Sequence, residues 1–221
     1  MKNILGIPIL YCVFTLLSLS SVSAQTFDIS SGGAPTITGA SGGSVTGSSS
    51  VLNDLIVTIH FGEVSPLNTN GIVKVIVPIA IRSQQEYQVG VSITSSTIAN
   101  AQAVQKTDIG FGANNFRSMG ANARICTSPH IFYSPFNNDP ASNVTINGSG
   151  RAAYPSSLNN IGASTVILSG PRLSQTAKAT RRSDNGYIFD AIFAITPQYY
   201  AAGSTTVTLT FTISAGPAAG C

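Results

Sequence analysis

The sequence predicts an all-β protein in which two antiparallel sheets pack as a β-sandwich. Short segments in which apolar and polar residues alternate recur along the chain, and clusters of Gly, Pro, Asn and Ser separate them. No segment has sustained helical periodicity, and the only window that could form a short helix is 97–104. Residues 51–221 are numerous enough to bury a complete core, so we expect a single domain there.

The first 24 residues have the three parts of a secretory signal peptide. Lys2 supplies a positive charge, residues 4–19 are mostly apolar, and Val22 and Ala24 supply small residues before a cleavage site at Gln25. A retained membrane anchor is the alternative, but the apolar stretch is shorter than the roughly 20 residues that span a bilayer. We therefore expect residues 1–24 to be removed, Cys12 included. The mature chain is then secreted, in the periplasm or at the cell surface, without a membrane span.

Residues 25–50 form a Gly/Ser-rich lead with few sizeable apolar residues. Such a composition buries little apolar surface and loses much conformational entropy when it becomes ordered. We therefore expect this segment to be flexible, or to be donated to the structure of another chain.

Three strands with clear alternation follow the lead. Residues 55–61, 72–82 and 87–94 each place every second apolar residue on one face. Within the second of them, Pro78 cannot donate a backbone hydrogen bond. We therefore expect that strand to lie at an edge, or to be bulged or interrupted at Pro78.

The remaining strands are shorter until the C-terminal part of the chain. Two glycines in residues 108–112 indicate a short strand that another backbone approaches closely. The Asn185-Gly186 pair is typical of a tight turn and leads into a strand over 187–195. The last strand, 205–213, alternates four apolar residues with threonines. Short extended candidates lie at 124–126, 131–133, 143–146 and 164–168.

The mature chain has two cysteines, Cys126 and Cys221. An exported chain enters an oxidising space, so we favour a disulfide bond between them. Such a bond would close a loop of nearly 100 residues and add about 3–5 kcal/mol if it is unstrained. Two free thiols, or an intermolecular bond through Cys221, are the alternatives.

The chain is poor in charge: 11 Lys and Arg face 8 Asp and Glu, and charged residues make up 9% of the total. Loss of Lys2 with the leader leaves a net charge of about +2, spread along the chain. This is too little to follow a phosphate backbone, so we do not expect nucleic acid as a partner.

In the stretch 56–66 an apolar strand leads into Phe61-Gly62-Glu63-Val64. In the stretch 200–213 Ala202-Gly203 precedes an alternating strand. These two stretches resemble secreted bacterial pilin-like sandwiches, those of the spore-coat-U type and of the archaic chaperone–usher pili. The resemblance implies an immunoglobulin-like sandwich that can lack one strand, which a periplasmic chaperone or the next subunit then donates.

On this view the lead 25–50 is the donated segment, and one face of the last strand helps to build the wall of the acceptor groove. The groove residues are Val207, Leu209, Phe211 and Ile213. A self-complete extracellular sandwich is the alternative.

Few side chains suit catalysis or metal binding. His60 and Glu63 flank a strand end and could offer two metal ligands, but no third is visible. His130 lies at a junction between loop and strand, and no Gly-x-Ser-x-Gly elbow is present. Asn137-Asn138-Asp139 is rich in oxygen, but it lacks the spacing of a calcium loop, so we favour a turn. We therefore expect no catalytic residues, no metal site and no cofactor.

Two further interpretations concern a charged residue inside a strand and a set of aromatic residues. Asp190 lies inside the strand 187–195; we expect an outward-facing charge, or an arginine partner if its face is covered. Several aromatic residues could form a platform for a sugar: Tyr133, Phe136, Tyr154, Tyr199 and Tyr200. For Tyr199 and Tyr200, which follow Pro197, plugging the end of the sandwich is the simpler interpretation.

These observations predict a secreted structural or adhesive protein, a subunit of a pilus (fimbrium) or surface filament or a cell-surface module. It would self-assemble or bind a chaperone by strand addition. A monomeric extracellular module that binds carbohydrate is the alternative, and a secreted hydrolase is a third.

Overall fold

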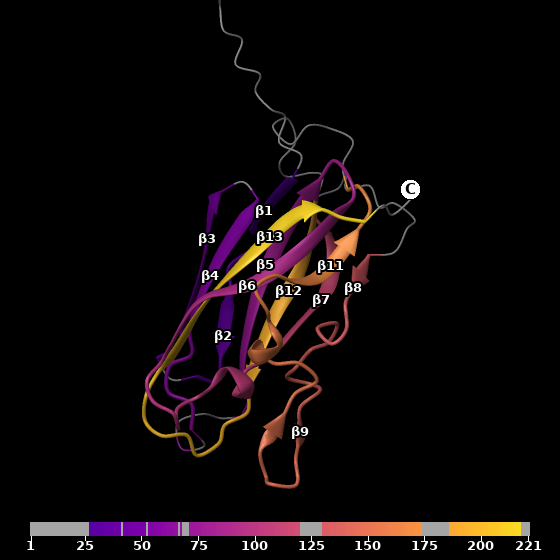
Figure 1. Cartoon of the computed structure of the whole chain (residues 1–221). Coiled ribbons are helices and arrows are strands. Elements are labelled where there is room, and N and C mark those ends of the chain that lie inside the picture. Colours follow the sequence, from indigo (N-terminus) through magenta and orange to yellow (C-terminus); the bar gives the residue numbers. More distant parts are fainter. Residues whose placement is uncertain are drawn as a thin grey trace, which may run out of the picture.

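The computed structural model describes residues 27–40, 42–51, 53–65, 67, 71–119, 130–173 and 186–217. Two antiparallel sheets pack face to face as a β-sandwich, so the predicted fold class is confirmed (Figure 1). The predicted signal peptide, the strand candidate 124–126 and both Cys126 and Cys221 lie outside the described residues. Over 97–104 the chain completes a strand and a turn, so no helix forms there.

The first sheet, sheet A, has the strand order β1 (Phe27–Ser31), β5 (Val73–Ser83), β12 (Gly186–Ile195), β7 (Gly110–Met119). The short β2 (Thr36–Thr38) also pairs with β5, further along the same edge. The second sheet, sheet B, has the order β3 (Ser44–Val51), β4 (Asp54–His60), β13 (Thr205–Ala215), β6 (Tyr87–Ile98), β11 (Thr165–Gly170), β8 (Ile131–Phe132).

The core lies between the sheets, and the alternation in the sequence explains it. In β4, β5 and β13 nearly every second residue is buried, as the pattern predicts. Phe111 of β7 packs against Phe193 in its own sheet and against Phe211 across the core, with ring centroids 5.1 and 6.5 Å apart. Fully burying an aromatic side chain of this size contributes about 1.5–3 kcal/mol.

Pro78 shows how β5 accepts a residue that cannot donate a backbone hydrogen bond. On one side β5 pairs with β12 without a break, and Pro78 lies opposite Asp190. On the other side β1 ends and β2 has not yet begun, and Gly32 donates its N–H to the Pro78 carbonyl oxygen at 2.8 Å. The prediction for this strand is therefore wrong, because β5 is an interior strand without a bulge or break at Pro78; the break lies in the neighbouring edge, between β1 and β2.

The Gly/Ser-rich lead is part of the sandwich, contrary to the flexibility that we expected from its composition. Its described residues form β1, β2 and β3, which pair with β5 and β4 of the same chain. The glycines serve close contacts: a Cβ on Gly32 would lie 3.0 Å from the Ile188 Cγ2, and Gly39 has φ of 83° where it approaches Ile72. Edge strands need only one buried face, and Ile29 supplies part of it.

The last strand, β13, is an interior strand of sheet B. It pairs with β4 along one edge and with β6 along the other. The four residues that we expected in a groove wall face the closed core, and each is between 0% and 1% exposed: Val207, Leu209, Phe211 and Ile213. In the described part of the chain, therefore, no acceptor groove runs along β13.

The segment between β8 and β11 covers part of the outer face of sheet A. It contains the small β9–β10 hairpin (Thr145–Ile146 and Ala152–Ala153) and a 3-10 turn, η2 (Leu158–Asn160). A Cβ on Gly112 of β7 would lie 2.1 Å from the backbone carbonyl oxygen of Asn138, so only glycine allows the two backbones to approach so closely. The predicted close approach of another backbone at residues 108–112 is therefore confirmed.

Candidate functional site

Several loops meet at one end of the sandwich, which we call the loop end. The pairing register places the end of β4, the end of β6 and the start of β13 together, since His60 and Ile98 lie opposite Thr206 and Thr205. The end of β12 lies beside the start of β5 and of β7 in the same way. The β9–β10 hairpin projects at this end too (Figure 1). Loops on a rigid sandwich are common positions for binding residues.

A cleft with a volume of about 610 Å³ lies among these loops. Its size matches sites that bind small molecules. The lining combines amide side chains, an arginine and a carboxylate with tyrosines and small residues: Ala101, Gln102, Ala103, Gln105, Asp108, Gly150, Arg151, Pro197, Gln198, Tyr199 and Tyr200.

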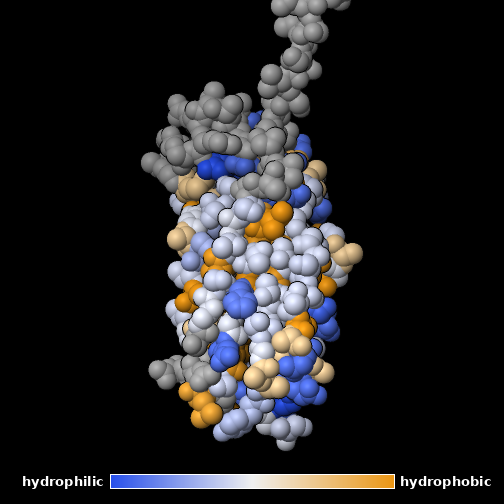
Figure 2. Space-filling model, turned by 90° about the vertical axis from the view of Figure 1, so that its left-hand side faces the viewer, coloured by the Kyte–Doolittle hydropathy of each residue, from blue (hydrophilic) through white to orange (hydrophobic). Residues whose placement is uncertain are grey.

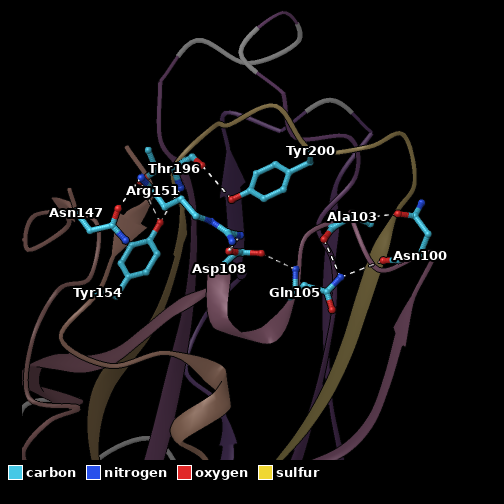
Figure 3. A network of polar contacts seen from close by, with 9 residues as sticks. All are labelled: Asn100, Ala103, Gln105, Asp108, Asn147, Arg151, Tyr154, Thr196 and Tyr200. Carbon is cyan, nitrogen blue, oxygen red and sulfur yellow. Dashed lines mark hydrogen bonds and ion pairs between the residues drawn. The ribbon is translucent and has the colours of Figure 1, made fainter. Parts of the chain in front are cut away.

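Asp108 is the buried anion of the cleft. It ends the 3-10 turn η1 (Lys106–Asp108), and its Oδ2 accepts a hydrogen bond from the Gln105 backbone N–H at 2.9 Å. Its other oxygen, Oδ1, pairs with the Arg151 Nη2 at 3.3 Å (Figure 3). Asp108 is only 8% exposed, so these two donors stabilise a carboxylate that has little access to water.

The β9–β10 hairpin positions Arg151. The Asn147 Oδ1 accepts hydrogen bonds from the backbone N–H groups of Ser149 and Arg151, each at 2.9 Å, which fixes the turn. The Arg151 side chain then crosses to Asp108 while 62% of it stays exposed. One edge of the guanidinium therefore binds the protein, and the exposed part can donate hydrogen bonds to a ligand.

Two tyrosines join the cleft to the end of β12. The Tyr154 hydroxyl lies 3.0 Å from the Thr196 Oγ1 and accepts a hydrogen bond from the Thr196 N–H at 2.7 Å. The Tyr200 hydroxyl donates to the Thr196 carbonyl oxygen at 3.4 Å, and both rings turn toward Thr196 (Figure 3). Burial raises the pKa of Tyr154 and of Tyr200, and the Asp108 carboxylate raises both further. Both hydroxyls therefore stay protonated at neutral pH and can donate.

Tyr199 is the exposed aromatic residue of the loop end. Its side chain is 88% exposed, whereas its neighbour Tyr200 is half-buried. Tyr199 lines the cleft and also a second hollow of about 200 Å³, whose lining includes Glu63, Leu67 and Val104. The tyrosine therefore stands between two depressions and offers its ring to both.

The loop that carries Gln102 and Gln105 is fixed by its own amides. The Asn100 Oδ1 accepts from the backbone N–H groups of Gln102 and Ala103, at 3.0 and 2.8 Å. The Gln105 Nε2 donates to the carbonyl oxygens of Asn100 and Ala103, at 3.0 and 2.8 Å (Figure 3). The wall of the cleft is thus formed before any ligand arrives, which lowers the entropic cost of binding.

The structure separates the five aromatic residues that we grouped as a possible platform. Tyr199, Tyr200 and Tyr154 meet at the loop end. Phe136 is buried against Phe111, and the Tyr133 hydroxyl lies 2.8 Å from the Ser169 Oγ, so these two are packing residues. Sequence position could not make this distinction, because it depends on where the segment after β8 folds back.

The histidines lie apart from each other. The His60 Nδ1 lies 2.8 Å from the Thr206 Oγ1 on the outer face of sheet B, while Glu63 lines the smaller hollow. No group of three His, Cys, Asp or Glu comes together among the described residues.

His130 lies in an aromatic cluster between the sheets. Its ring centroid is 4.1 Å from that of Phe116 and 5.5 Å from that of Tyr187, and its Nδ1 lies 3.1 Å from the Tyr87 hydroxyl. Burial lowers the pKa of His130 from 6.5 to about 4. It is therefore neutral at physiological pH and acts as a packing residue.

Asp190 and Asp139 form ion pairs that stabilise sheet A. Asp190 is 7% exposed and accepts hydrogen bonds from the Arg117 Nη2 at 2.9 Å and from the Asn115 side chain. The second of our two alternatives, a covered face with an arginine partner, is thus the correct one. Asp139 pairs with the Lys74 Nζ at 2.6 Å and accepts from the Ala141 N–H, as expected for a turn.

The pair of Asp108 and Arg151 has no signature in the sequence. The two residues are 43 positions apart, and only the fold of the segment after β8 brings them together. Asp108 caps the η1 turn, and no sequence signal pointed to its second partner.

Comparison of the chain with models of protein families, with curated proteins and with solved structures gave no match. The resemblance to pilin-like sandwiches therefore stays a prediction. In the part of the chain that the structure describes, no helix has the length and hydrophobicity that crossing a membrane requires.

Proposed function

We propose that the protein is a secreted adhesive module that binds carbohydrate in the cleft at its loop end. The observation that carries the proposal is Tyr199, an exposed aromatic ring between two depressions, beside an exposed arginine and several amides. Aromatic side chains that line a depression together with a few polar groups are typical of ligand-binding sites.

The chemistry of the cleft fits a sugar. A sugar ring has an apolar C–H face, which packs on a tyrosine ring, and hydroxyl groups at its rim, which need donors and acceptors nearby. The rim can bond to Gln102, Gln198 and the exposed part of the Arg151 guanidinium. Two depressions on either side of Tyr199 suit a chain of linked sugars better than a single one.

A self-complete module is supported over a subunit that awaits a donor strand. The described lead lies in the chain's own sheets, and β13 is paired along both edges. The predicted leader supports a protein that acts outside the cell.

The test is binding of the mature chain to an array of neutral oligosaccharides, followed by calorimetry with the best ligand. We expect Tyr199→Ala to weaken binding at least tenfold, which corresponds to about 1.4 kcal/mol, and Tyr199→Phe to retain most of the affinity. Arg151→Gln should weaken binding as well. Thr212→Ala, on the outer face of sheet B, is the matched control and should bind like the wild type.

Absence of binding to every oligosaccharide on the array would refute the proposal. Binding that is unchanged in both Tyr199→Ala and Arg151→Gln would show that carbohydrate is bound elsewhere on the molecule, and would equally refute it.

A further inference from the structure

The sheet edges of the sandwich are not equally protected. An unpaired edge strand exposes backbone donors and acceptors that another chain can bind, so proteins usually shorten, interrupt or cover their edges. The outer edge of β7 is covered, because Phe111 and Ala113 donate their N–H groups to the carbonyl oxygens of Ser156 and Phe136 at 3.1 and 2.7 Å. β8 has two residues, and the opposite edge of sheet A is divided into the short β1 and β2.

β3 differs from these three edges. It runs for eight residues, Ser44–Val51, and it contains neither a charged residue nor a proline. It pairs with β4 on one side, and no described residue pairs with its other side. Thr46, Gly47 and Ser48 are exposed. Figure 2 views the molecule from the side on which β3 lies, where residues of intermediate hydropathy cover much of the surface. The only usual protection on β3 is a shift in its pairing register with β4 after Ser48, so the stretch 44–48 is an uninterrupted, uncharged edge.

We propose that β3 pairs with the β3 strand of a second copy of this chain, antiparallel, about a two-fold axis at Thr46. The two sheets B then form one continuous sheet. Under this symmetry Ser44 lies opposite the partner's Ser48, and Thr46 lies opposite its own copy.

The side chains of β3 complement each other in this register. Val45 and Gly47 lie opposite Ile59 and Val57 of β4, whose side chains are buried, so both face inward. The two-fold axis places Val45 of each copy opposite Gly47 of the other, so the valine occupies the space that the glycine leaves. On the outer face the Ser and Thr hydroxyls meet each other, and such cross-strand pairs stabilise antiparallel pairing.

A second copy fits this edge because the edge is uncharged and self-complementary. Identical patches meet across a two-fold axis, so any charge on the strand would meet a like charge nearby. The paired segment is short, so the buried area is below the roughly 1,200 Å² of a stable complex, and we expect a dimer with a dissociation constant in the micromolar range or weaker.

The antiparallel arrangement has a consequence that rests on the proposed function. The two loop ends lie at opposite ends of the dimer, so two clefts that bind carbohydrate would connect two separate surfaces.

Sedimentation equilibrium of the mature full chain, from about 1 µM to about 1 mM, tests the pairing directly. We expect concentration-dependent dimers for the wild type. Thr46→Lys and Thr46→Glu should each be at least tenfold weaker, because like charges meet on the axis, and circular dichroism checks that each variant is folded. An equal mixture of the two variants should restore the dimer, because opposite charges then meet at the same position. Thr94→Lys, exposed on β6 of the same sheet, is the control and should dimerise like the wild type.

A wild type that is monomeric throughout this range would overturn the proposal. Dimers that resist both charged variants, or that the mixture does not restore, would overturn it too, because the contact would then lie elsewhere or have another register. The measurement does not depend on carbohydrate, so its failure is distinct from failure of the proposed function.

Discussion

Sheet A and sheet B have opposite kinds of outer face. The outer face of sheet A is largely covered: Ala80, Ile192 and Ala194 are between 0% and 3% exposed although they point away from the core. The outer face of sheet B is open and has rows of hydroxyl groups, where Thr46 lies opposite Thr58 and Thr58 opposite Thr208. The same fold thus has one face that is part of a second packing layer and one that meets the solvent.

The charges follow this division. Among the described residues the four ion pairs lie on the outer face of sheet A or in the loops at its end: Lys74–Asp139, Arg82–Asp28, Arg117–Asp190 and Arg151–Asp108. On sheet B the contacts are hydroxyl bonds, such as that between Thr58 and Thr208 at 3.1 Å. Two of these pairs join neighbouring strands of sheet A, and the other two attach the segment between β8 and β11 to the sandwich through Asp139 and Arg151.

The largest effect expected from this difference concerns Gly112. In Gly112→Ala the new Cβ would lie 2.1 Å from the Asn138 oxygen, so the covering segment must move away from sheet A. We expect the free energy of unfolding to fall by about 3 kcal/mol, measured by urea denaturation.

Gly47→Ala on sheet B is the matched control for Gly112. There the nearest atom, the Leu55 Cδ1, is 3.9 Å from the new Cβ, and we expect a change within about 0.5 kcal/mol in dilute protein. Equal effects of the two alanines would contradict the view that only sheet A is covered.

The next effect concerns the buried carboxylate of sheet A. Asp190→Ala removes the partner of Arg117 and of Asn115, and the Asn115 backbone has φ of 58°. We expect a loss of about 2 kcal/mol, because hydrogen bonds to a buried charged group are lost, while the exposed donors of Arg117 and Asn115 bind water instead.

Asp139→Ala gives a comparison for Asp190 on the same face. The side chains of Asp139 and Lys74 are 21% and 30% exposed, so solvent screens their pair and we expect a loss of about 1 kcal/mol or less in the same assay. A larger loss at Asp139 than at Asp190 would mean that burial does not determine the strength of these pairs.

The sequence predicted the strands well because burial on one face leaves a period of two. Segments 55–61, 187–195 and 205–213 agree with β4, β12 and β13 to within two residues. The lead was mispredicted because its composition indicates disorder, whereas edge strands can be built from small residues when a neighbour supplies the pairing. Composition indicates how much apolar surface a segment can bury by itself. β1, β2 and β3 instead become ordered by pairing with β5 and β4.

The loop end was predicted only in part. Tyr199 and Tyr200 could be singled out, because two adjacent tyrosines after a proline interrupt the strand pattern. Their meeting with Asp108 and Arg151 depends on the path of the segment between β8 and β11, which has little regular structure. Contacts that depend on such a path leave no period in the sequence.

A smaller effect concerns the seam between the two sheets, where His130 contacts Tyr87 of sheet B and Tyr187 of sheet A. Burial lowers the pKa of His130 to about 4, below its usual 6.5, so the unfolded chain binds this proton more tightly than the folded chain. The titration of His130 therefore does not change stability above about pH 6.5, and stability falls as the pH drops from there toward 4.

Because His130 is only half-buried, we expect its share of this loss to be about 1 kcal/mol. Thermal unfolding of the wild type and of His130→Gln between pH 7 and pH 4 measures it: the two curves should converge on acidification. Curves that stay parallel would show that His130 titrates alike in the folded and unfolded chain.

The smallest effect should come from the hydroxyl rows of sheet B. Thr208→Val keeps the shape and the β-branching but removes the hydroxyl that lies 3.1 Å from the Thr58 Oγ1. Both groups are partly exposed, so water replaces the lost partner, and we expect a change within about 0.5 kcal/mol by urea denaturation.

The double variant Thr58→Val/Thr208→Val should be as stable as the wild type but less soluble, since it makes part of the exposed outer face of sheet B apolar. A loss above about 1 kcal/mol in either variant would mean that the rows stabilise the fold, as the ion pairs of sheet A do. Unchanged stability with lower solubility would assign the hydroxyls to the surface alone, where they keep a sheet with few charges in solution.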